Sequence, residues 1–578
     1  MVGSWPGSQA HLSSRRFAMA TTPLTAKYPA KDHVVRTFKT LTYSLHPSQR
    51  DKPQVIVLAG SETPCRNDTD RELPFRQESN FFYLSGCAVP GTSFLATYHP
   101  DSATVSTKLY VPKATLEDLM WSPASPSPSE ARAAYEVDDV FYKVEFVDHL
   151  KSLPADALVH VLPRTGEFPD VRSYVDKSSP GHPLGNSGSA VTEEHLLPAL
   201  HQTRLIKDAF EIALIRKANE ISSRAHEVVM RVLGLAVQGK IKQDNGHGNK
   251  RPLLPAEWLI ETEAEAEAVF VASCRREGAF HQAYLPIVAA NDRAATLHYC
   301  CNDKAFAWGP VTNRHANNGG HLTSMVSQRE CGSVLAPQVL LIDAGCEWEC
   351  YSSDITRTMP VGNGGKFTTE ARAIYDLVLQ MQQESLTMLR PSVHWDDVQL
   401  RCHEVLVDGF LRLGIFRNAE TSHANMKSHG DLRHDILTSG LSAAFFPHGV
   451  GHSLGLDVHD VPSASKPQKA GKYFVPGSIA SGSSGAGGHE SFYKFLRLRL
   501  PLLAGMVVTV EPGIYFSPHL LGPHMDSCFL DKTVLARYES VGGIRIEDDV
   551  LITENGSENL TMVGSETAWI EEVCAGEV

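Results

Sequence analysis

The chain has 578 residues, of which 42% are hydrophobic and 21% are charged, and its formal net charge at pH 7 is −13. This length predicts more than one domain, and the composition is typical of a globular protein rather than a disordered or fibrous one. The acidic balance argues against a nucleic-acid partner. No apolar run reaches the roughly 18 residues that a membrane span needs, so we also expect no membrane partner.

The 11 cysteines are scattered along the chain and follow no secretory signal. Such a distribution is typical of reduced thiols in an intracellular compartment, and we expect a cytoplasmic protein. Residues 1–26 contain no acidic side chain and include the dipeptide Arg15–Arg16, so a mitochondrial presequence is the alternative. We therefore expect these residues to be disordered or to serve in targeting.

Residues 27–175 carry strand-like runs between turn-rich segments, which predicts a self-contained N-terminal α/β domain. The runs are VIVLAG, FFYLSG, SFLATYHP and ALVHVLP. A stretch rich in Gly, Ser and Pro follows, and it predicts a linker over 176–203.

A second domain is expected over 204–560, because helical periodicity begins at Arg204. The pattern predicts helices over 204–233 and 368–389, the second with Thr368 or Thr369 as its N-cap. Polar, Gly-rich stretches near 238–251, 312–324 and 463–490 interrupt this domain. We interpret them as surface decoration, and lids over a site are the alternative.

Two aspartates flank a predicted turn in LLIDAGCEWECYSSDITRTMP, residues 340–360. A hairpin closed around Trp348 and Glu349 would place Asp343 directly opposite Asp354, with Cβ atoms about 5 Å apart. Facing carboxylates are unfavourable unless one is protonated or a cation lies between them. Two ordinary turn aspartates are the alternative reading of this stretch alone.

Two further carboxylates lie at the ends of apolar strands, Glu511 in GMVVTVEPGIYF and Glu547 in GGIRIEDDVLIT. In the second segment, Ile544 and Ile546 can face a core while Arg545 and Glu547 share the opposite face. A single carboxylate at a strand end is usually solvated, but four of them beside Gly-bounded strands indicate a site.

Three histidines cluster in FFPHGVGHSLGLDVHD, namely His448, His452 and His459, between glycines that allow close approach of the backbone. Their spacing is not HExxH, so a helical zinc-protease site is not indicated. Four carboxylates and one imidazole suit two hard divalent cations, with Mn²⁺ favoured. Two ions about 3.5–4 Å apart can share a bridging water, lower its pKa and polarise a carbonyl. We therefore predict a dinuclear metal centre.

The motifs DAGCEWECYSSD, HGVGH, VEPG and RIEDD, in this order, resemble the five-ligand dinuclear site of the Xaa-Pro peptidases, aminopeptidase P and prolidase. FRQESNFFYLSG resembles the N-terminal domain of aminopeptidase P, which helps enclose the site in oligomers of that family. The resemblance spans most of the chain. It implies an α/β (α+β) fold, with an N-terminal α/β domain followed by a pita-bread catalytic domain, and a homo-oligomer.

The resemblance also implies the ligands of two divalent ions per subunit. They are Asp343, Asp354, His452, Glu511 and Glu547. Asp354 and Glu547 would bridge both ions, Asp343 would serve one ion, and His452 with Glu511 would serve the other. Glu511 would in addition handle the proton of the attacking water.

Further side chains would shape the substrate pocket. His448 and His459 match the two pocket histidines that assist proton transfer and substrate carbonyl binding, and His298 matches a third pocket histidine upstream. Arg545, two residues before a bridging ligand, would orient that ligand and damp the local negative charge.

The implied reaction is hydrolysis, by a hydroxide bridging the two ions, of the bond between an N-terminal residue and a penultimate proline. Proline-containing peptides are therefore the expected partners. A strict Xaa-Pro dipeptidase would need a basic grip on the substrate carboxylate, and Arg497 stands where prolidase-type enzymes carry one, with Arg499 as a rival. We favour the aminopeptidase over this dipeptidase. A catalytically silent binding protein is a weaker alternative, because all five ligand positions are filled.

Overall fold

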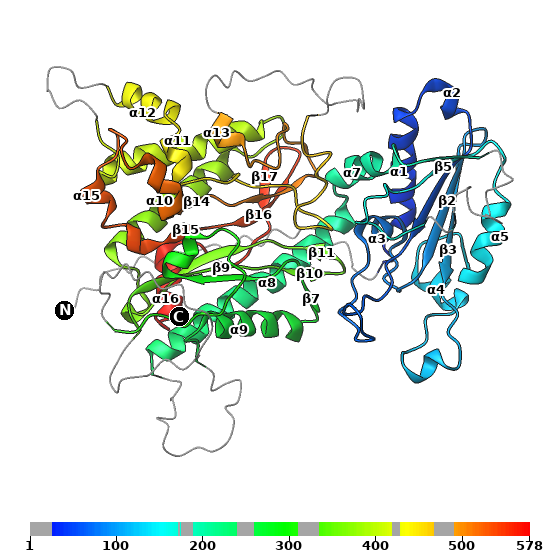
Figure 1. Cartoon of the computed structure of the whole chain (residues 1–578), viewed down its shortest axis with the longest axis horizontal. Helices are drawn as coiled ribbons and strands as arrows, with labels where there is room; N and C mark the ends of the chain where they lie inside the picture. The colour runs from blue at the N-terminus through cyan, green and yellow to red at the C-terminus, as the bar shows by residue number, and fades with distance from the viewer. Residues whose placement is uncertain are drawn as a thin grey trace, which may run out of the picture.

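The computed structural model describes residues 26–171, 174, 189–239, 259–309, 335–418, 428–467 and 490–578. Two bodies of structure lie next to each other, with the N-terminal one on the right of Figure 1. The N-terminal segment expected to be disordered or targeting, and most of the three Gly-rich stretches, fall outside the described residues. Within these ranges no helix is both long and apolar enough to cross a membrane.

The N-terminal body is built on a mixed six-stranded sheet in the order β4-β3-β2-β1-β5-β6. Its strands are β1 Gln54–Ala59, β2 Ser93–His99, β3 Thr104–Val111, β4 Asp139–Tyr142, β5 Leu158–His160 and β6 Ala190–Thr192. β1 and β2, and β2 and β3, pair antiparallel, while β3–β4, β1–β5 and β5–β6 are parallel. The predicted α/β domain is therefore present.

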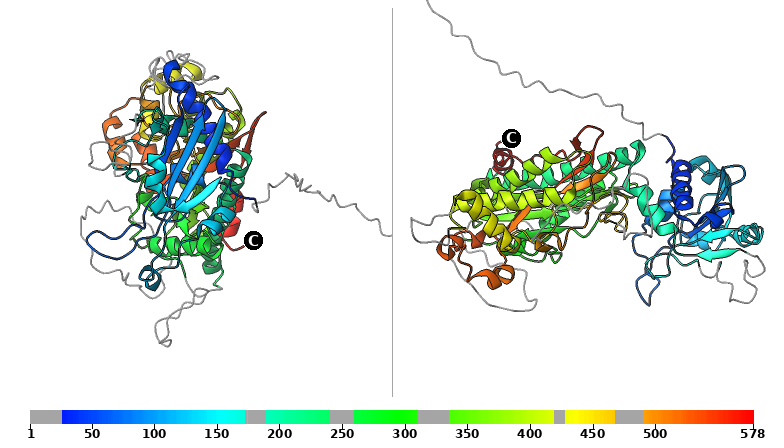
Figure 2. Two further views of the ribbon diagram at one scale, coloured as in Figure 1. Left: turned by 90° about the vertical axis from the view of Figure 1, so that its right-hand side faces the viewer. Right: turned by 90° about the horizontal axis from the view of Figure 1, so that it is seen from above.

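Both faces of this sheet are covered. Successive side chains of β1 point to opposite faces, and those on each face are apolar and pack against a helix. Ile56 and Leu58 pack in one cluster with Phe38 of helix α1 (Ala30–Ser44). Val55 and Val57 pack in another with helix α5 (Phe146–Lys151). In Figure 1 the strands β2, β3 and β5 lie between α1 and α5, and the left view of Figure 2 turns the broad face of the sheet toward the viewer.

The run FFYLSG, predicted as a strand, is instead helix α3 (Ser79–Ser85). The Glu78 side chain accepts hydrogen bonds from the backbone of Asn80 and Phe81, and Gly86 ends the helix at φ 64°. These caps outweigh the β-propensity of the aromatic residues, because they satisfy the backbone groups that a short helix leaves open.

The described part of the predicted linker is ordered. Its residues form β6, which extends the sheet, and most of helix α7 (Leu196–Leu205). The following helix, α8 (Ala209–Val237), begins five residues later than Arg204, the predicted start. Asp208 and Glu211 form a capping box there, so a local polar signal fixes the start of the helix more sharply than the apolar period did.

The second body combines several short antiparallel sheets with long helices. Its strands are β7 His281–Gln282, β8 Ile287–Ala290, β9 Gln338–Asp343, β10 Cys346–Trp348, β11 Tyr351–Ser352, β12 Thr356–Val361, β13 Val507–Val510, β14 Gly513–Tyr515, β15 Gly543–Arg545, β16 Asp548–Ile552 and β17 Ser557–Asn559. Its longer helices are α8, α9 Glu263–Arg276, α10 Thr369–Met388, α11 Trp395–Leu413, α12 His429–Thr438 and α16 Thr567–Cys574. The Thr368 N-cap of α10 is confirmed.

The predicted hairpin forms, but its register differs from the expected one. The turn falls on Glu349 and Cys350, both at positive φ, and Asp343 pairs with Thr356 rather than Asp354. Tyr351 is fully buried and pairs with Trp348 across the turn, which offsets the cost of two non-glycine residues in the left-handed region. Because the register shifts by two residues, both aspartates stay on one face.

Gly345 makes this hairpin possible, because a Cβ there would lie 1.8 Å from the Ser353 carbonyl oxygen. We expect Gly345→Ala to destabilise the fold by about 1–3 kcal/mol, the usual cost of overpacking. Gly430→Ala is the control, since nothing lies within 4 Å of the added Cβ. Thermal unfolding of both variants checks this, and equal melting temperatures would contradict it.

Candidate metal centre

The four predicted acidic residues come from strand ends that converge in the second body. Asp343 is the last residue of β9, and Asp354 stands between β11 and β12. Glu511 directly follows β13, and Glu547 lies between β15 and β16. Strand ends hold these side chains on backbone that is fixed by pairing, so their positions do not depend on long loops.

Asp354, His452 and Glu547 form one tight group. Each offers a potential ligand atom within 4.8 Å of those of the other two, and all three are buried. The Nε2 atom of His452 lies 3.4 Å from Asp354 Oδ2 and 3.5 Å from Glu511 Oε1. Its Nδ1 atom lies 3.1 Å from the Ser453 carbonyl oxygen, which orients the ring so that Nε2 faces the carboxylates.

Asp343 joins this group through two neighbours. The Tyr284 hydroxyl oxygen lies 2.5 Å from Oδ1 of Asp343 and 2.5 Å from Oδ1 of Asp354, and its single hydrogen can be donated to either carboxylate. Arg545 donates to the other oxygen of Asp343, also at 2.5 Å. Sequence reasoning missed Tyr284, because a single tyrosine after a short strand carries no spacing signal.

Arg545 acts on a second carboxylate through a hydroxyl. Its Nε atom donates to Thr356 Oγ1 at 3.1 Å, and that hydroxyl donates to Glu547 Oε2 at 2.6 Å. Arg545 therefore contacts Asp343 directly and reaches Glu547, the ligand that it was expected to orient, through Thr356.

The charges of the group are strongly perturbed. Burial raises the pKa of Glu547 and of Asp343, with the neighbouring carboxylates adding to the shift. Burial also raises the pKa of Glu511 to about 7, although His452 and Arg545 oppose it. Carboxylates this close and this buried need more positive charge than one arginine supplies. A set of four carboxylates and one imidazole fits divalent cations that accept oxygen and nitrogen ligands.

His448 lies beside the same group, with its Nδ1 atom 3.6 Å from Glu511 Oε2. Its Nε2 atom lies 2.8 Å from the Tyr515 hydroxyl, which also accepts from Arg545 at 2.9 Å. Burial and the charge of Arg545 lower the pKa of His448 to about 3, so the ring is neutral at physiological pH. Tyr515 was not identified from the sequence.

His459 stands edge-on to His452, with ring centroids 4.5 Å apart. Partial burial and the charge of His452 lower the pKa of His459 to about 3. Smaller effects of the charges of Arg497 and His298 act in the same direction. The structure therefore places His448 beside Glu511 and His459 beside His452, while the expected pocket roles of His298 and Arg497 stay predictions.

Arg499, the rival of Arg497, is engaged elsewhere. Its Nε atom donates to Asp396 Oδ1 at 3.1 Å, and its guanidinium lies 5.0 Å from the ring centroid of Tyr493. This leaves Arg497 as the candidate of the pair for the predicted carboxylate-binding role.

Comparison with known proteins agrees with this geometry. The family model described as metallopeptidase family M24 matches residues 213–554, and the one for the aminopeptidase P N-terminal domain matches residues 32–160. The chain is 37% identical to a probable Xaa-Pro aminopeptidase of Aspergillus clavatus, covering 96% of this chain and 98% of the relative. It is 36% identical to one of Pyricularia oryzae, covering 95% and 97%.

Solved structures give the same result. Aminopeptidase P from E. coli with the inhibitor Pro-Leu superposes with a TM-score of 0.64 at 25% identity, over 96% of this chain and 100% of that one. Proline aminopeptidase P II from Yersinia pestis gives a TM-score of 0.64 at 26% identity, over 95% and 100%. The expected pita-bread catalytic domain is thereby confirmed. With its buried carboxylates and imidazole and an N-terminal domain of the aminopeptidase P type, the chain belongs to metallopeptidase family M24.

Proposed function

We propose that this protein is an Xaa-Pro aminopeptidase, which hydrolyses the bond between an N-terminal residue and a penultimate proline. The observation that carries the proposal is the convergence of Asp354, His452 and Glu547, with Asp343 and Glu511 beside them, in a family M24 catalytic domain. The names of the relatives supply the substrate class. A silent binding protein of this family would have no reason to keep so costly a cluster of buried charges.

Five residues would hold two divalent ions, for which we propose Mn²⁺ because the donors are mostly carboxylate oxygens. They are Asp343, Asp354, His452, Glu511 and Glu547. When bound, the ions supply Lewis acidity toward a water and a peptide carbonyl.

The protein's own side chains would manage the protons and the developing charge. The Glu511 carboxyl, which lies 3.5 Å from Nε2 of His452, is placed to take a proton from the attacking water and return it. The neutral rings of His448 and His459 can donate to the substrate carbonyl as negative charge develops there. A proline nitrogen carries no hydrogen, so recognition must rest on the carbonyl and the ring rather than on an N–H group.

Discrimination between dipeptides and longer peptides would take place near His459. The charge of Arg497 lowers the pKa of His459, and a guanidinium in that region can bind a free carboxylate. In a dipeptide that carboxylate belongs to the proline itself. In longer substrates it lies farther along the chain, so we propose that Arg497 contributes to binding without restricting the enzyme to dipeptides.

We also propose that the protein forms a homo-oligomer. Leu116, Met120 and Trp121, on a short segment of the N-terminal body, are 88%, 70% and 81% exposed. Large apolar side chains gathered in this way are typical of contact surfaces. Every cysteine in the described ranges is a free thiol, which supports the proposal of a cytoplasmic location.

The first test compares an Xaa-Pro dipeptide with an Xaa-Pro-Xaa tripeptide, using the Mn²⁺-loaded protein. We expect cleavage of the tripeptide after its first residue. Arg497→Met should weaken dipeptide hydrolysis more than tripeptide hydrolysis, since only the dipeptide presents its carboxylate at the proline. Cleavage of the dipeptide alone would make the protein a strict dipeptidase, and cleavage of neither would support the binding-protein alternative.

Asp354→Asn tests the metal centre at nearly constant side-chain volume. Because this change removes a proposed bridging charge, we expect a loss of activity beyond the roughly 10–100-fold typical of residues that only support a ligand. Bound metal, measured by elemental analysis, should fall below two ions per chain. Asp435→Asn, on helix α12, is the control. Full metal content with wild-type turnover in Asp354→Asn would refute the ligand assignment.

The exposed apolar segment gives a test of assembly. We expect Trp121→Ser combined with Leu116→Ser to weaken self-association, which light scattering coupled to size-exclusion chromatography measures. Val144→Ser, which changes another exposed apolar residue at 78% exposure, is the control. The same molar mass for all three proteins would exclude this segment from the contact.

A further inference from the structure

The N-terminal body supplies none of the proposed metal ligands. Its Arg76 forms hydrogen bonds and an ion pair with two segments of the catalytic body. The Arg76 guanidinium lies 3.1 Å from the Glu347 carboxylate of β10. It also donates to the Cys350 carbonyl oxygen at 3.3 Å, in the turn of the hairpin that carries Asp343 and Asp354. A third bond, of 2.5 Å, goes to the Leu456 carbonyl oxygen. One side chain thus ties the hairpin that leads to Asp354 to the segment that leads to His459.

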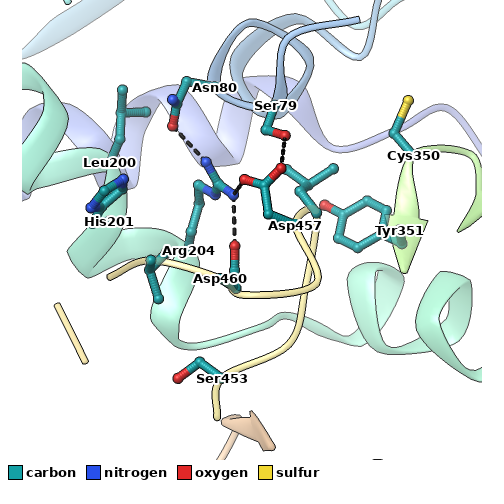
Figure 3. Close-up of polar contacts among 12 residues, drawn as sticks. Ser79, Asn80, Leu200, His201, Arg204, Cys350, Tyr351, Ser453, Asp457 and Asp460 are labelled. Carbon is teal, nitrogen blue, oxygen red and sulfur yellow. Dashed lines mark hydrogen bonds and ion pairs between the residues drawn. The ribbon is translucent and has the colours of Figure 1, made fainter. Parts of the chain in front are cut away.

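A second set of polar contacts centres on Arg204, at the end of α7 (Figure 3). One of its nitrogens lies 2.6 Å from both Asp457 Oδ2 and Asp460 Oδ1, and another donates to Asn80 Oδ1 at 2.7 Å. Arg204 is only 2% exposed. Its contacts therefore join helix α3 of the N-terminal body to the residues on either side of His459.

Two more contacts complete this network. The Ser79 hydroxyl donates to Asp457 Oδ1 at 2.6 Å, as Figure 3 shows. Lys207 donates to the second oxygen of Asp460 at 2.9 Å. Both aspartates that flank His459 thus have each carboxylate oxygen engaged.

The backbone of this segment is strained, and the contacts of Asp457 and Asp460 can stabilise its conformation. Val461, a β-branched residue that is buried, has φ at +42°. Conformations of this kind persist where the surroundings determine them, and they cluster at functional sites. Gly455 adds a close approach, since a Cβ there would lie 2.4 Å from Asp460 Oδ2.

Stability alone is a weak explanation for these contacts. Replacing buried ion pairs with apolar side chains is often neutral or stabilising, so a cluster of them on both sides of one residue calls for another role. The residue that they flank is His459, whose ring meets the proposed ligand His452 edge-on.

We propose that Arg76 and Arg204 are positioning residues for His459, through which docking of the N-terminal body sets the rate of the catalytic body. Among the residues that the structure describes, neither arginine bonds to a proposed metal ligand. They act on Leu456, Asp457 and Asp460, and these in turn fix the His459 ring against His452. This inference rests on the proposed peptidase function for its effect on turnover, but its structural part stands independently.

The test is a double-mutant cycle on the Mn²⁺-loaded enzyme. Arg76→Met should lower kcat for the tripeptide about 10–100-fold, as loss of a supporting contact does, with KM and bound metal little changed. In a His459→Ala background the same substitution should lower kcat less than threefold, because the residue that it positions is gone. Arg216→Met, which removes an ion pair with Glu558 inside the catalytic body, is the matched control. Equal losses in both backgrounds, or no loss in either, would overturn the proposal.

Amide hydrogen exchange provides a measurement that needs no activity. The Asp460 amide donates to the Ser453 carbonyl oxygen at 2.9 Å, and it should exchange at least tenfold faster in Arg76→Met than in the wild type. Amides of β12 should not change. Ser79→Ala, a smaller perturbation of the same network, serves if Arg76→Met does not fold. Unchanged Asp460 exchange would overturn the proposal. A wild-type protein that cleaves no Xaa-Pro peptide would instead refute the proposed function.

Discussion

The structure depends on burying several carboxylates beside one imidazole in a small volume. Isolated buried charges are too costly to keep, so each must be balanced by a cation or by hydrogen bonds. Arg545 and Tyr284 supply part of this balance at Asp343, and His452 supplies part at Asp354. The remaining charge is what divalent ions can neutralise. The same burial that makes the cluster costly makes such ions effective, because electrostatic interactions are stronger away from water.

The surrounding fold is arranged to hold that cluster rigidly. Each acidic residue stands at or beside the end of a paired strand, where the backbone position is set by hydrogen bonds to a neighbour. Gly345 and Gly451 permit close backbone contacts, since a Cβ on either would lie within about 2 Å of a carbonyl oxygen. Apolar side chains from α8, α10 and α11 pack beneath these strands in one continuous core.

The two bodies are joined by polar contacts as well as by packing. A separate group at the interface, His33 with Asp208 and Glu211, adds to the Arg76 and Arg204 contacts. Polar groups need defined partners at defined angles, so they determine orientation more narrowly than apolar contacts do. The N-terminal body can therefore influence catalysis from a distance without supplying any reacting group.

The sequence by itself determined the donor types, their attachment to apolar strands, the Thr368 cap and the family, because these depend on residue identity and short-range spacing. The local caps that make FFYLSG a helix, Glu78 and Gly86, were also present in the sequence. Only the tertiary structure decided that the hairpin turns at Glu349 and that Arg499 binds Asp396. The same holds for Tyr284, whose partners lie 59 and 70 residues away. Contacts between residues this far apart arise from packing, and local periodicity carries no information about them.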